Sequence, residues 1–379
     1  MMVINRILYR MGEYIMIASI KGNEQITKML NDWYIEIRAR HIGKAHKLKL
    51  EIDQKIHNIE EDQNLLLYYS LLDFRHQYMV DSLSIGKDSF DKVESLEVPA
   101  DQFLSYYYHF FKAIHSNITG NFTSAKEHYN KAEELLNHIP DEVEHGEFYF
   151  KLSTFHYHIY KPLAAIKEAT KAKEIFKKHA GYEATIALCD NLIGLACTHL
   201  KQFEEAEEHF ITAINTFKKS GEEKFITFVR HNLGLMYAGQ NLSELAIRYL
   251  SEVIQELPKD YKAIFIKARE HMEMGDSEET SNLIDKGLEV CKELKNEEYE
   301  HHFWILEKLN QKVTADELEK TIKTGISYFE RENLHEYVQE YAKKLAVLFH
   351  QENNRSKASD YFYLSHQAEE KNFEKEALK

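Results

Sequence analysis

The fold is decided by the stretch Asn232-Leu-Gly-Leu-Met-Tyr237, which Ala246 and Pro258 follow. Gly234 stands twelve positions before Ala246, and pairs of small residues with this separation recur upstream at intervals of roughly 40 residues. Small side chains are needed where two helices approach closely, because a large one would force them apart. The pattern predicts a tandem array of helical hairpins, whose earlier members are Ala113 with Ala125, Ser153 with Ala165, and Gly194 with Ala206.

The composition favours an all-α fold. Only 4 Pro and 14 Gly interrupt the 379 residues, so a sheet of any size is not expected. The net charge of -14 argues against a nucleic-acid partner, because phosphates are bound by a basic face. Cys189, Cys197 and Cys291 lack the spacing of a metal site or a CxxC motif. We therefore expect reduced thiols in a cytoplasmic protein that has no metal site of its own.

The apolar N-terminal segment does not predict a membrane span. Arg6, Arg10 and Glu13 interrupt residues 1–20, and no other stretch approaches the length of about 18 apolar residues that a span requires. We expect no membrane partner. Residues 1–22 are interpreted as an N-terminal extension that need not be ordered.

Three helical stripes of apolar residues follow the extension. They predict a three-helix bundle over residues 23–83. Residues 84–104 contain Gly, Asp and Pro and are interpreted as a polar linker. The repeats occupy residues 105–379. We therefore predict two modules, the bundle and the repeat domain, joined by the linker.

The stretch around Gly234 resembles the tetratricopeptide-repeat consensus of Leu-Gly-x-x-Tyr, Ala and Pro. Weaker copies continue along the chain, and we count about seven repeats between Tyr106 and Ala368. Such repeats stack into a superhelix in which each repeat buries its apolar face against its neighbours. The first helices of the repeats line a concave groove, which is the default binding site.

An acidic run, Glu60-Glu-Asp-Gln63, stands directly before an aromatic helix. Taken alone, it is typical of a helix N-terminus, with Asp62 as the cap and the charges complementing the helix dipole. The run is also part of a longer pattern that resembles the Rap family of Bacillus and its relatives. The other parts of that pattern are Leu30-Asn-Asp-Trp-Tyr34, Leu67-Tyr-Tyr-Ser-Leu71, Phe74-Arg-His76, Tyr106-Tyr-Tyr-His-Phe-Phe-Lys112 and Glu142-Val-Glu-His-Gly-Glu-Phe-Tyr-Phe-Lys151.

The resemblance implies a protein that acts on response regulators of two-component signalling and is controlled by short peptides of the Phr type. In the phosphatase members the glutamine of this run reaches the receiver's active site, which makes Gln63 the candidate catalytic residue. Glu60, Glu61 and Asp62 would orient the bundle against the regulator. The receiver would bring its own Mg²⁺. Two apolar residues of the same helix, Leu67 and Phe74, are candidate anchors for the regulator, with bundle core as the alternative interpretation.

Peptide contacts are expected on the first helices of the repeats. Asn232 occupies a position where peptide-binding repeats use an amide to hold the ligand backbone, as in the Rap peptide site. His199 departs from the family, since many members have an aspartate there that meets a cationic peptide residue. The other candidates by repeat position, for which a solvated or mutually packed lining is the alternative, are Phe150, Tyr157, Asn191, Phe265, Arg269, Met272, Phe303 and Glu307.

Three functions remain open at the level of sequence. The first is a phosphatase for the aspartyl phosphate of a response regulator, inhibited by a peptide. The second is a non-catalytic anti-activator that sequesters a DNA-binding regulator, since members of that kind also carry the acidic run. The third, a peptide-regulated transcription factor, lacks support because the first 100 residues contain no basic recognition helix.

Overall fold

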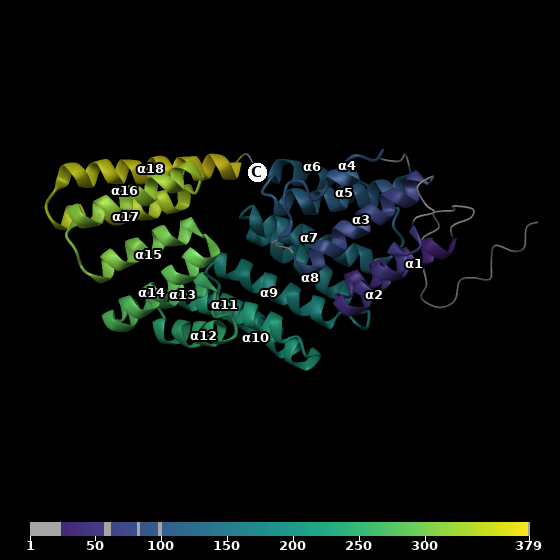
Figure 1. The fold of residues 1–379 in the computed structure, drawn as a ribbon, viewed down its shortest axis with the longest axis horizontal. Helices are drawn as coiled ribbons and strands as arrows, with labels where there is room; N and C mark the ends of the chain where they lie inside the picture. The colour runs from purple at the N-terminus through teal and green to yellow at the C-terminus, as the bar shows by residue number, and fades with distance from the viewer. Residues whose placement is uncertain (1–23, 57–61, 82–83, 98–100, 378–379) are drawn as a thin grey trace, which may run out of the picture. The chain divides into compact units, whose positions relative to one another are not determined.

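We describe the fold from a computed structural model in which residues 24–56, 62–81, 84–97 and 101–377 are described (Figure 1). Over these ranges the chain consists of helices joined by short turns, and it contains no strand. The predicted all-α fold is confirmed. The N-terminal extension lies outside the described residues. No helix within the described ranges is long and apolar enough to cross a membrane.

Four helices precede the repeats. Helices α1 (Glu24–Arg38), α2 (Ile42–Asp53) and α3 (Gln63–Val80) fall in the segment where a bundle was predicted, and the single-turn α4 (Asp91–Glu94) lies in the predicted linker. Trp33 of α1 is fully buried, and its indole N–H donates to Nδ1 of His76 on α3 at 3.2 Å. The first three helices therefore share one core.

The remaining helices follow in antiparallel succession. Each is 13 to 23 residues long. In α12 and α16 the buried residues form one stripe, as the repeat pattern requires, whereas α5 and α7 are buried on most of their faces. Their bounds are α5 (Gln102–Ile118), α6 (Phe122–Leu136), α7 (Glu142–His158), α8 (Pro162–Phe176), α9 (Glu183–His199), α10 (Phe203–Ser220), α11 (Glu223–Ala238), α12 (Ser243–Glu256), α13 (Tyr261–Glu273), α14 (Ser277–Leu294), α15 (Glu297–Asn310), α16 (Ala315–Arg331), α17 (His335–Gln351) and α18 (Arg355–Ala377).

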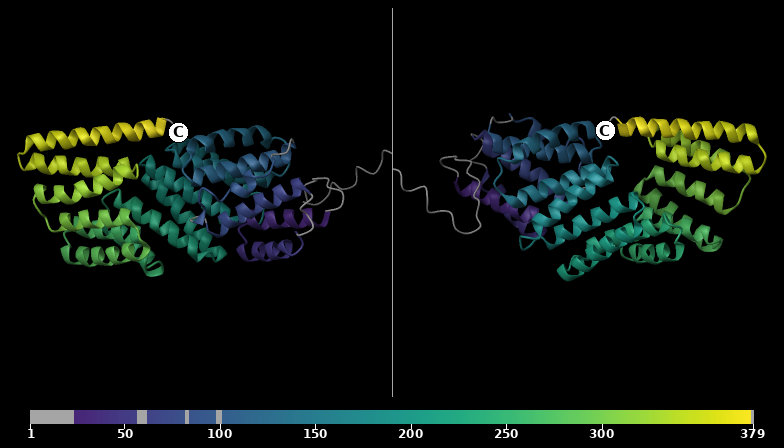
Figure 2. Two further views of the ribbon diagram at one scale, coloured as in Figure 1. Left: turned by 45° about the horizontal axis from the view of Figure 1, so that its top comes forward. Right: turned by 180° about the vertical axis from the view of Figure 1, so that it is seen from behind.

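The chain divides into two compact units, residues 1–196 and 197–379, and the division falls inside α9. In the first unit, the N-terminal helices and the first repeats share a continuous core that includes Trp33, Phe74 and Phe148. In the second unit, helices α13 to α18 lie one beside another in chain order (Figure 2). Compactness therefore groups α1 to α3 with the first repeats, whereas the sequence placed a linker between them.

The turn between the two helices of a hairpin has a recurring geometry. At Tyr160 and Asn241 the backbone is left-handed, with φ of 53° and 58°. The backbone N–H of the following residue donates to the carbonyl five residues before it and so closes the helix. Arg40 ends α1 in the same way, with φ of 60° and a 3.0 Å bond from the His41 N–H to the Glu36 carbonyl. Five residues after Arg40 stands Ala45, fully buried like the small residues of the repeats. Helices α1 and α2 thus form a hairpin of the repeat type.

Glycines mark the closest helix contacts of the second unit. A Cβ added at Gly234 would lie 2.7 Å from Cγ of Leu250, and one added at Gly287 would overlap the ring of Phe303. At Gly325 an added Cβ would meet Cδ1 of Ile305 at 3.2 Å, which is a milder contact. Gly234 and Gly287 therefore require glycine, because the facing side chains already occupy the space of a Cβ, whereas Gly325 is less constrained.

The Gly287→Ala variant should lose more stability than Gly325→Ala. The added methyl group at position 287 has no free space, so we expect a loss of about 1–3 kcal/mol in the free energy of unfolding. At position 325 the expected loss is less than about 1 kcal/mol. Urea denaturation followed by circular dichroism measures both. Gly43→Ala on α2, where nothing lies within 4 Å of the added Cβ, is the control and should be neutral or stabilising. Equal losses at 287 and 43 would contradict the packing argument.

Candidate functional site

Gln63 is the first residue of α3, and its side chain is exposed. The helix start is fixed by Asp62, whose carboxylate accepts from the backbone N–H groups of Asn64 and Leu65, both at 3.1 Å. Asp62 is therefore the cap that the sequence suggested. Glu60 and Glu61 lie outside the described residues. The arrangement presents the Gln63 carboxamide to solvent at the end of a well-anchored helix.

The middle of α3 is closed to partners. Leu67 and Phe74 are 0% and 2% exposed, and Phe74 packs edge-on against Phe90 with ring centroids 5.0 Å apart. The expectation that these two side chains anchor a regulator was wrong, and the alternative interpretation as core applies. From residue 65 to residue 76, α3 has no fully exposed side chain, because α1, α2 and α5 pack around it. Only its ends, including Gln63, are open to a partner.

Polar contacts fix α3 against α2. Lys49 lies 3.0 Å from a carboxylate oxygen of Asp73 and 3.1 Å from Asp53, and the Tyr69 hydroxyl donates to Asp53 at 2.6 Å. Burial lowers the pKa of His76, and the nearby Lys49 adds to this effect, so the ring stays neutral when it accepts from Trp33. The amide at the start of α3 is thus carried by a helix whose rotation is fixed.

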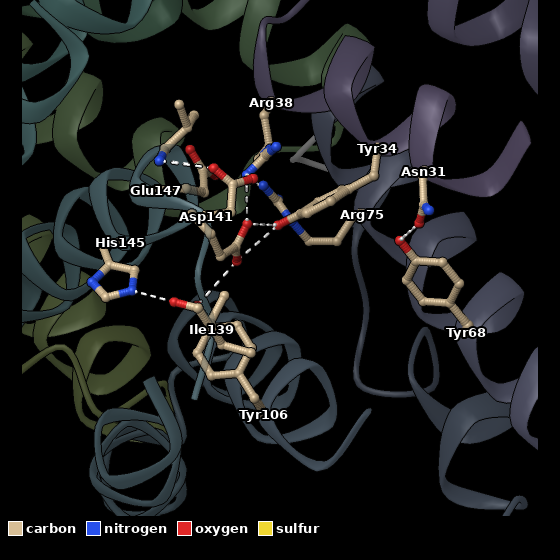
Figure 3. Close-up of polar contacts among 12 residues, drawn as sticks. Asn31, Tyr34, Arg38, Tyr68, Arg75, Tyr106, Ile139, Asp141, His145 and Glu147 are labelled. Atoms are coloured by element: carbon tan, nitrogen blue, oxygen red, sulfur yellow. Dashed lines mark hydrogen bonds and ion pairs between the residues drawn. The ribbon is translucent and has the colours of Figure 1, made fainter. Parts of the chain in front are cut away.

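A buried polar seam joins α1 and α3 to α7 (Figure 3). At its centre is Glu144, which is fully buried and accepts from the hydroxyls of Tyr34 and Tyr106 at 2.8 and 3.0 Å. Arg38 also donates to Glu144 at 3.1 Å and lies 2.7 Å from Asp141. We call this group, together with Arg75 and Glu147, the polar seam.

The Arg75–Glu147 pair of the polar seam holds α3, the helix of Gln63, against α7. Arg75 of α3 pairs with Glu147 of α7 at 2.6 Å, and the two side chains are 3% and 2% exposed. Burial alone would raise the pKa of Glu147, but Lys151 and Arg75 outweigh it and hold the pKa below its ordinary value. Removing one partner of such a pair leaves an uncompensated buried charge, which is strongly destabilising. The pair therefore fixes the docking of α3 on the first repeats.

Among the expected peptide contacts, those of the first unit differ in access. Phe150 is 7% exposed, and its ring is covered by Arg40 and Lys151, whose charged groups lie 5.8 and 5.0 Å from the ring centroid. Tyr157 and Asn191 are half-buried. Phe150 is therefore a covered side chain in this structure.

In the second unit one expected contact is contradicted. Phe303 is fully buried because its ring fills the space beside Gly287, so it cannot line a groove. His199 is exposed, and five others are half-buried and remain predictions, namely Asn232, Phe265, Arg269, Met272 and Glu307.

Two exposed apolar side chains on the helix of Asn232 were not predicted from the sequence. Phe228 and Leu235 are 46% and 44% exposed on α11. They stand four positions before and three positions after Asn232, so the three side chains share one face of the helix. This helical spacing was the signal that could have identified them. An exposed apolar pair beside an amide suits a peptide ligand.

Further along the second unit, a shallow hollow of about 350 Å³ has Leu309, Val347 and Leu348 in its wall.

Within the described ranges, no three His, Cys, Asp or Glu side chains are grouped as metal ligands would be.

Glu144 should give the stability of this protein a distinctive pH dependence. Burial raises the pKa of its carboxyl from the ordinary 4.5 to about 7, so between these values the folded state binds the extra proton and stability falls as the pH rises. Glu144→Gln keeps the side-chain shape and should remove a slope on the order of 1 kcal/mol per pH unit. Urea titrations at pH 5, 6 and 7 measure the slope. Glu133→Gln, an exposed residue of α6, is the control and should leave it unchanged.

The sequence of this protein is similar to a family model and to several known proteins. The family model described as "response regulator aspartate phosphatase H, N terminal" matches residues 20–81, the segment that contains α1 to α3 and Gln63. Two relatives from Bacillus subtilis (strain 168) are each 27% identical to this chain. They are regulatory protein RapF, over 91% of this chain and 94% of the relative, and response regulator aspartate phosphatase A, over 88% and 91%.

Solved structures agree with these matches. A Rap protein complexed with competence and sporulation factor superposes with a TM-score of 0.78 at 25% identity and covers 93% of this chain and 99% of its own. The apo form of RapI gives 0.69 at 25% identity over 92% and 99%. The apo quorum sensor NprR from B. thuringiensis, at 18% identity, shares the fold with a TM-score of 0.76. Because these matches extend over nearly the whole chain, this protein is similar to Rap proteins along most of its length, and its residues 20–81 match the N-terminal family model.

Proposed function

We propose that this protein binds a response regulator and hydrolyses the aspartyl phosphate of its receiver domain. The observation that carries the proposal is Gln63, an exposed amide at the capped end of α3, inside the segment that matches the phosphatase family model. Several relatives are named response regulator aspartate phosphatases, at 25–28% identity. We place the reaction in the cytoplasm.

The chemistry requires an amide and a fixed helix. The Gln63 side-chain oxygen accepts a hydrogen bond from the attacking water, and its NH₂ group donates to a phosphoryl or receiver oxygen. Water attacks phosphorus in line, the bond from phosphorus to the aspartyl oxygen breaks, and the products are the free carboxylate and inorganic phosphate. The receiver supplies Mg²⁺ and the phosphoaspartate. This chain supplies orientation, which the Asp62 cap and the Arg75–Glu147 pair maintain.

A short peptide of the Phr type regulates this activity by binding along the first helices of the repeats. Support comes from two related structures, a Rap protein complexed with competence and sporulation factor and a plasmid-encoded Rap regulator complexed with the Phr* peptide. In this chain, α11 offers Asn232 between the exposed Phe228 and Leu235. The amide would hold the peptide backbone, and the two apolar side chains would contact its side chains.

The alternative is sequestration of a DNA-binding regulator without hydrolysis. Some of the relatives, including RapC and RapK, are named regulatory proteins. Both functions need α3 to meet the regulator, but only hydrolysis needs the carboxamide of Gln63. The next experiment separates them.

Gln63→Ala should abolish the accelerated loss of label from a ³²P-phosphorylated receiver. We expect a fall of about 100-fold in the rate, because water loses its positioning group. The assay uses a panel of purified receiver domains, and binding of each is measured in parallel. Gln77→Ala, an exposed glutamine at the other end of α3, is the control and should retain activity. Tight binding of one receiver with no acceleration by the wild-type protein would refute hydrolysis and support sequestration.

Asp62 should affect the rate through the conformation of Gln63. Asp62→Ala removes the cap and should cost about 1 kcal/mol of helix stability, while Asp62→Asn keeps a capping oxygen. We expect the alanine variant to lower the dephosphorylation rate and the asparagine variant to restore most of it, measured with the same labelled receiver. Equal loss in both variants would show that the charge of Asp62, and not its cap, matters.

A further inference from the structure

Three buried or half-buried cations gather around two aromatic rings of the first unit. Lys151 of α7 places its ammonium 4.7 Å from the ring centroid of Tyr78 and 5.0 Å from that of Phe150. The guanidinium of Arg75 lies 5.3 Å from the Tyr78 ring, and that of Arg40, in the α1–α2 turn, lies 5.8 Å from the Phe150 ring. We call Arg40, Arg75 and Lys151 the cation cluster.

The cluster carries more positive charge than its surroundings neutralise. Glu147 is its acidic partner, 2.6 Å from Arg75 and 3.9 Å from Lys151. Among the described residues, the other acids of this region are already engaged: Asp141 and Glu144 by Arg38, and Asp190 by Lys173 at 2.6 Å. Three cations therefore face one carboxylate. Contact with the two rings offsets part of the cost of burying them, but it adds no negative charge.

The cluster also contains unused hydrogen-bond donors, a feature that Arg38 of the polar seam shares at its own Nε. The Nε atoms of Arg40 and Arg75 are buried and have no acceptor within the described structure, and the Arg75 side chain is 3% exposed. Buried N–H groups are nearly always paired, and an unpaired one costs free energy. Two guanidinium donors at one cluster thus lack an acceptor.

The titration behaviour of the neighbours is consistent with excess positive charge. Burial lowers the pKa of Lys151, and Arg40 and Arg75 lower it further, while Tyr78 and Glu147 act in the opposite direction. Burial would raise the pKa of Tyr78, yet Lys151, Arg75 and Arg40 together hold it below its ordinary value. Both shifts reduce the net positive charge of the cluster.

We propose that the cation cluster of Arg40, Arg75 and Lys151 is a binding site for an oxyanion, a carboxylate or a phosphate. Guanidinium groups are well suited to both, because their N–H groups match the geometry of paired oxygens. A free inorganic phosphate is one source. The other is a carboxylate of a bound peptide, since Phe150 is among the expected groove residues; this second source rests on the proposed function, whereas the site itself does not.

The test compares the thermal stability of the full chain in potassium chloride, phosphate and acetate at equal ionic strength. A specific oxyanion should raise the Tm of the wild-type protein by roughly 2 °C at ten times its dissociation constant. Lys151→Met removes one excess charge, so it should raise the Tm in chloride and lose the oxyanion response. Arg38→Met is the matched control, because Arg38 is paired with Asp141 and Glu144, and it should lower the Tm.

The outcomes separate the possibilities. A response to phosphate alone assigns free phosphate as the occupant, and a response that includes acetate assigns a carboxylate. If neither oxyanion exceeds chloride, or if Lys151→Met lowers the Tm in chloride as Arg38→Met does, the site does not exist and Lys151 is only a structural partner of Glu147. Arg40→Gln, at a half-buried position, repeats the test if Lys151→Met fails to fold. Gln63→Ala should keep the oxyanion response even if the protein proves not to be a phosphatase.

Discussion

The structure of the first unit depends on the burial of charge between α7 and the N-terminal helices. Glu144 and Glu147 face inward from α7, and Arg38 and Arg75 reach them from α1 and α3. A buried ion pair contributes little net stability compared with apolar packing, but it tolerates few other arrangements because an unmatched partner is costly. The polar seam therefore selects one docking of α3, and with it the direction in which Gln63 is presented.

Because of this arrangement, α3 contributes its middle side chains to the core and exposes Gln63 at its first turn. The middle of α3 is enclosed, so its side chains hold the N-terminal helices together. Its first turn projects into solvent, where Asp62 fixes the backbone and Gln63 is open. A rigid element that exposes only its end suits a group that must be oriented accurately for water attack, since small misplacements are expensive in rate. A partner gains access to the amide without disturbing the core.

Much of the fold was predictable from the sequence, and the predictions that failed did so for physical reasons. The small residues at Ala206 and Gly234 predicted the hairpins because close helix approach depends on local composition. Leu67 and Phe303 could not be assigned a side from their apolar character alone, since core and contact residues share that chemistry. Charged residues such as Glu144 are usually exposed, so nothing local identified it as buried; its partners are up to 110 residues away in sequence. The α1–α2 hairpin was missed because the residue twelve positions before Ala45 is Trp33, where the predicted repeats have a small residue.

The left-handed backbone at the helix turns lowers the stability of the folded chain. At eight positions of the described chain, residues other than glycine hold a left-handed backbone, among them Arg40, Tyr160 and Asn241. Each such residue costs about 1 kcal/mol relative to glycine, less where it is asparagine. The array thus contains a distributed reserve of strain, lying at hairpin ends away from Gln63. Thermostability could be raised one turn at a time, in small increments, without altering Gln63 or the polar seam.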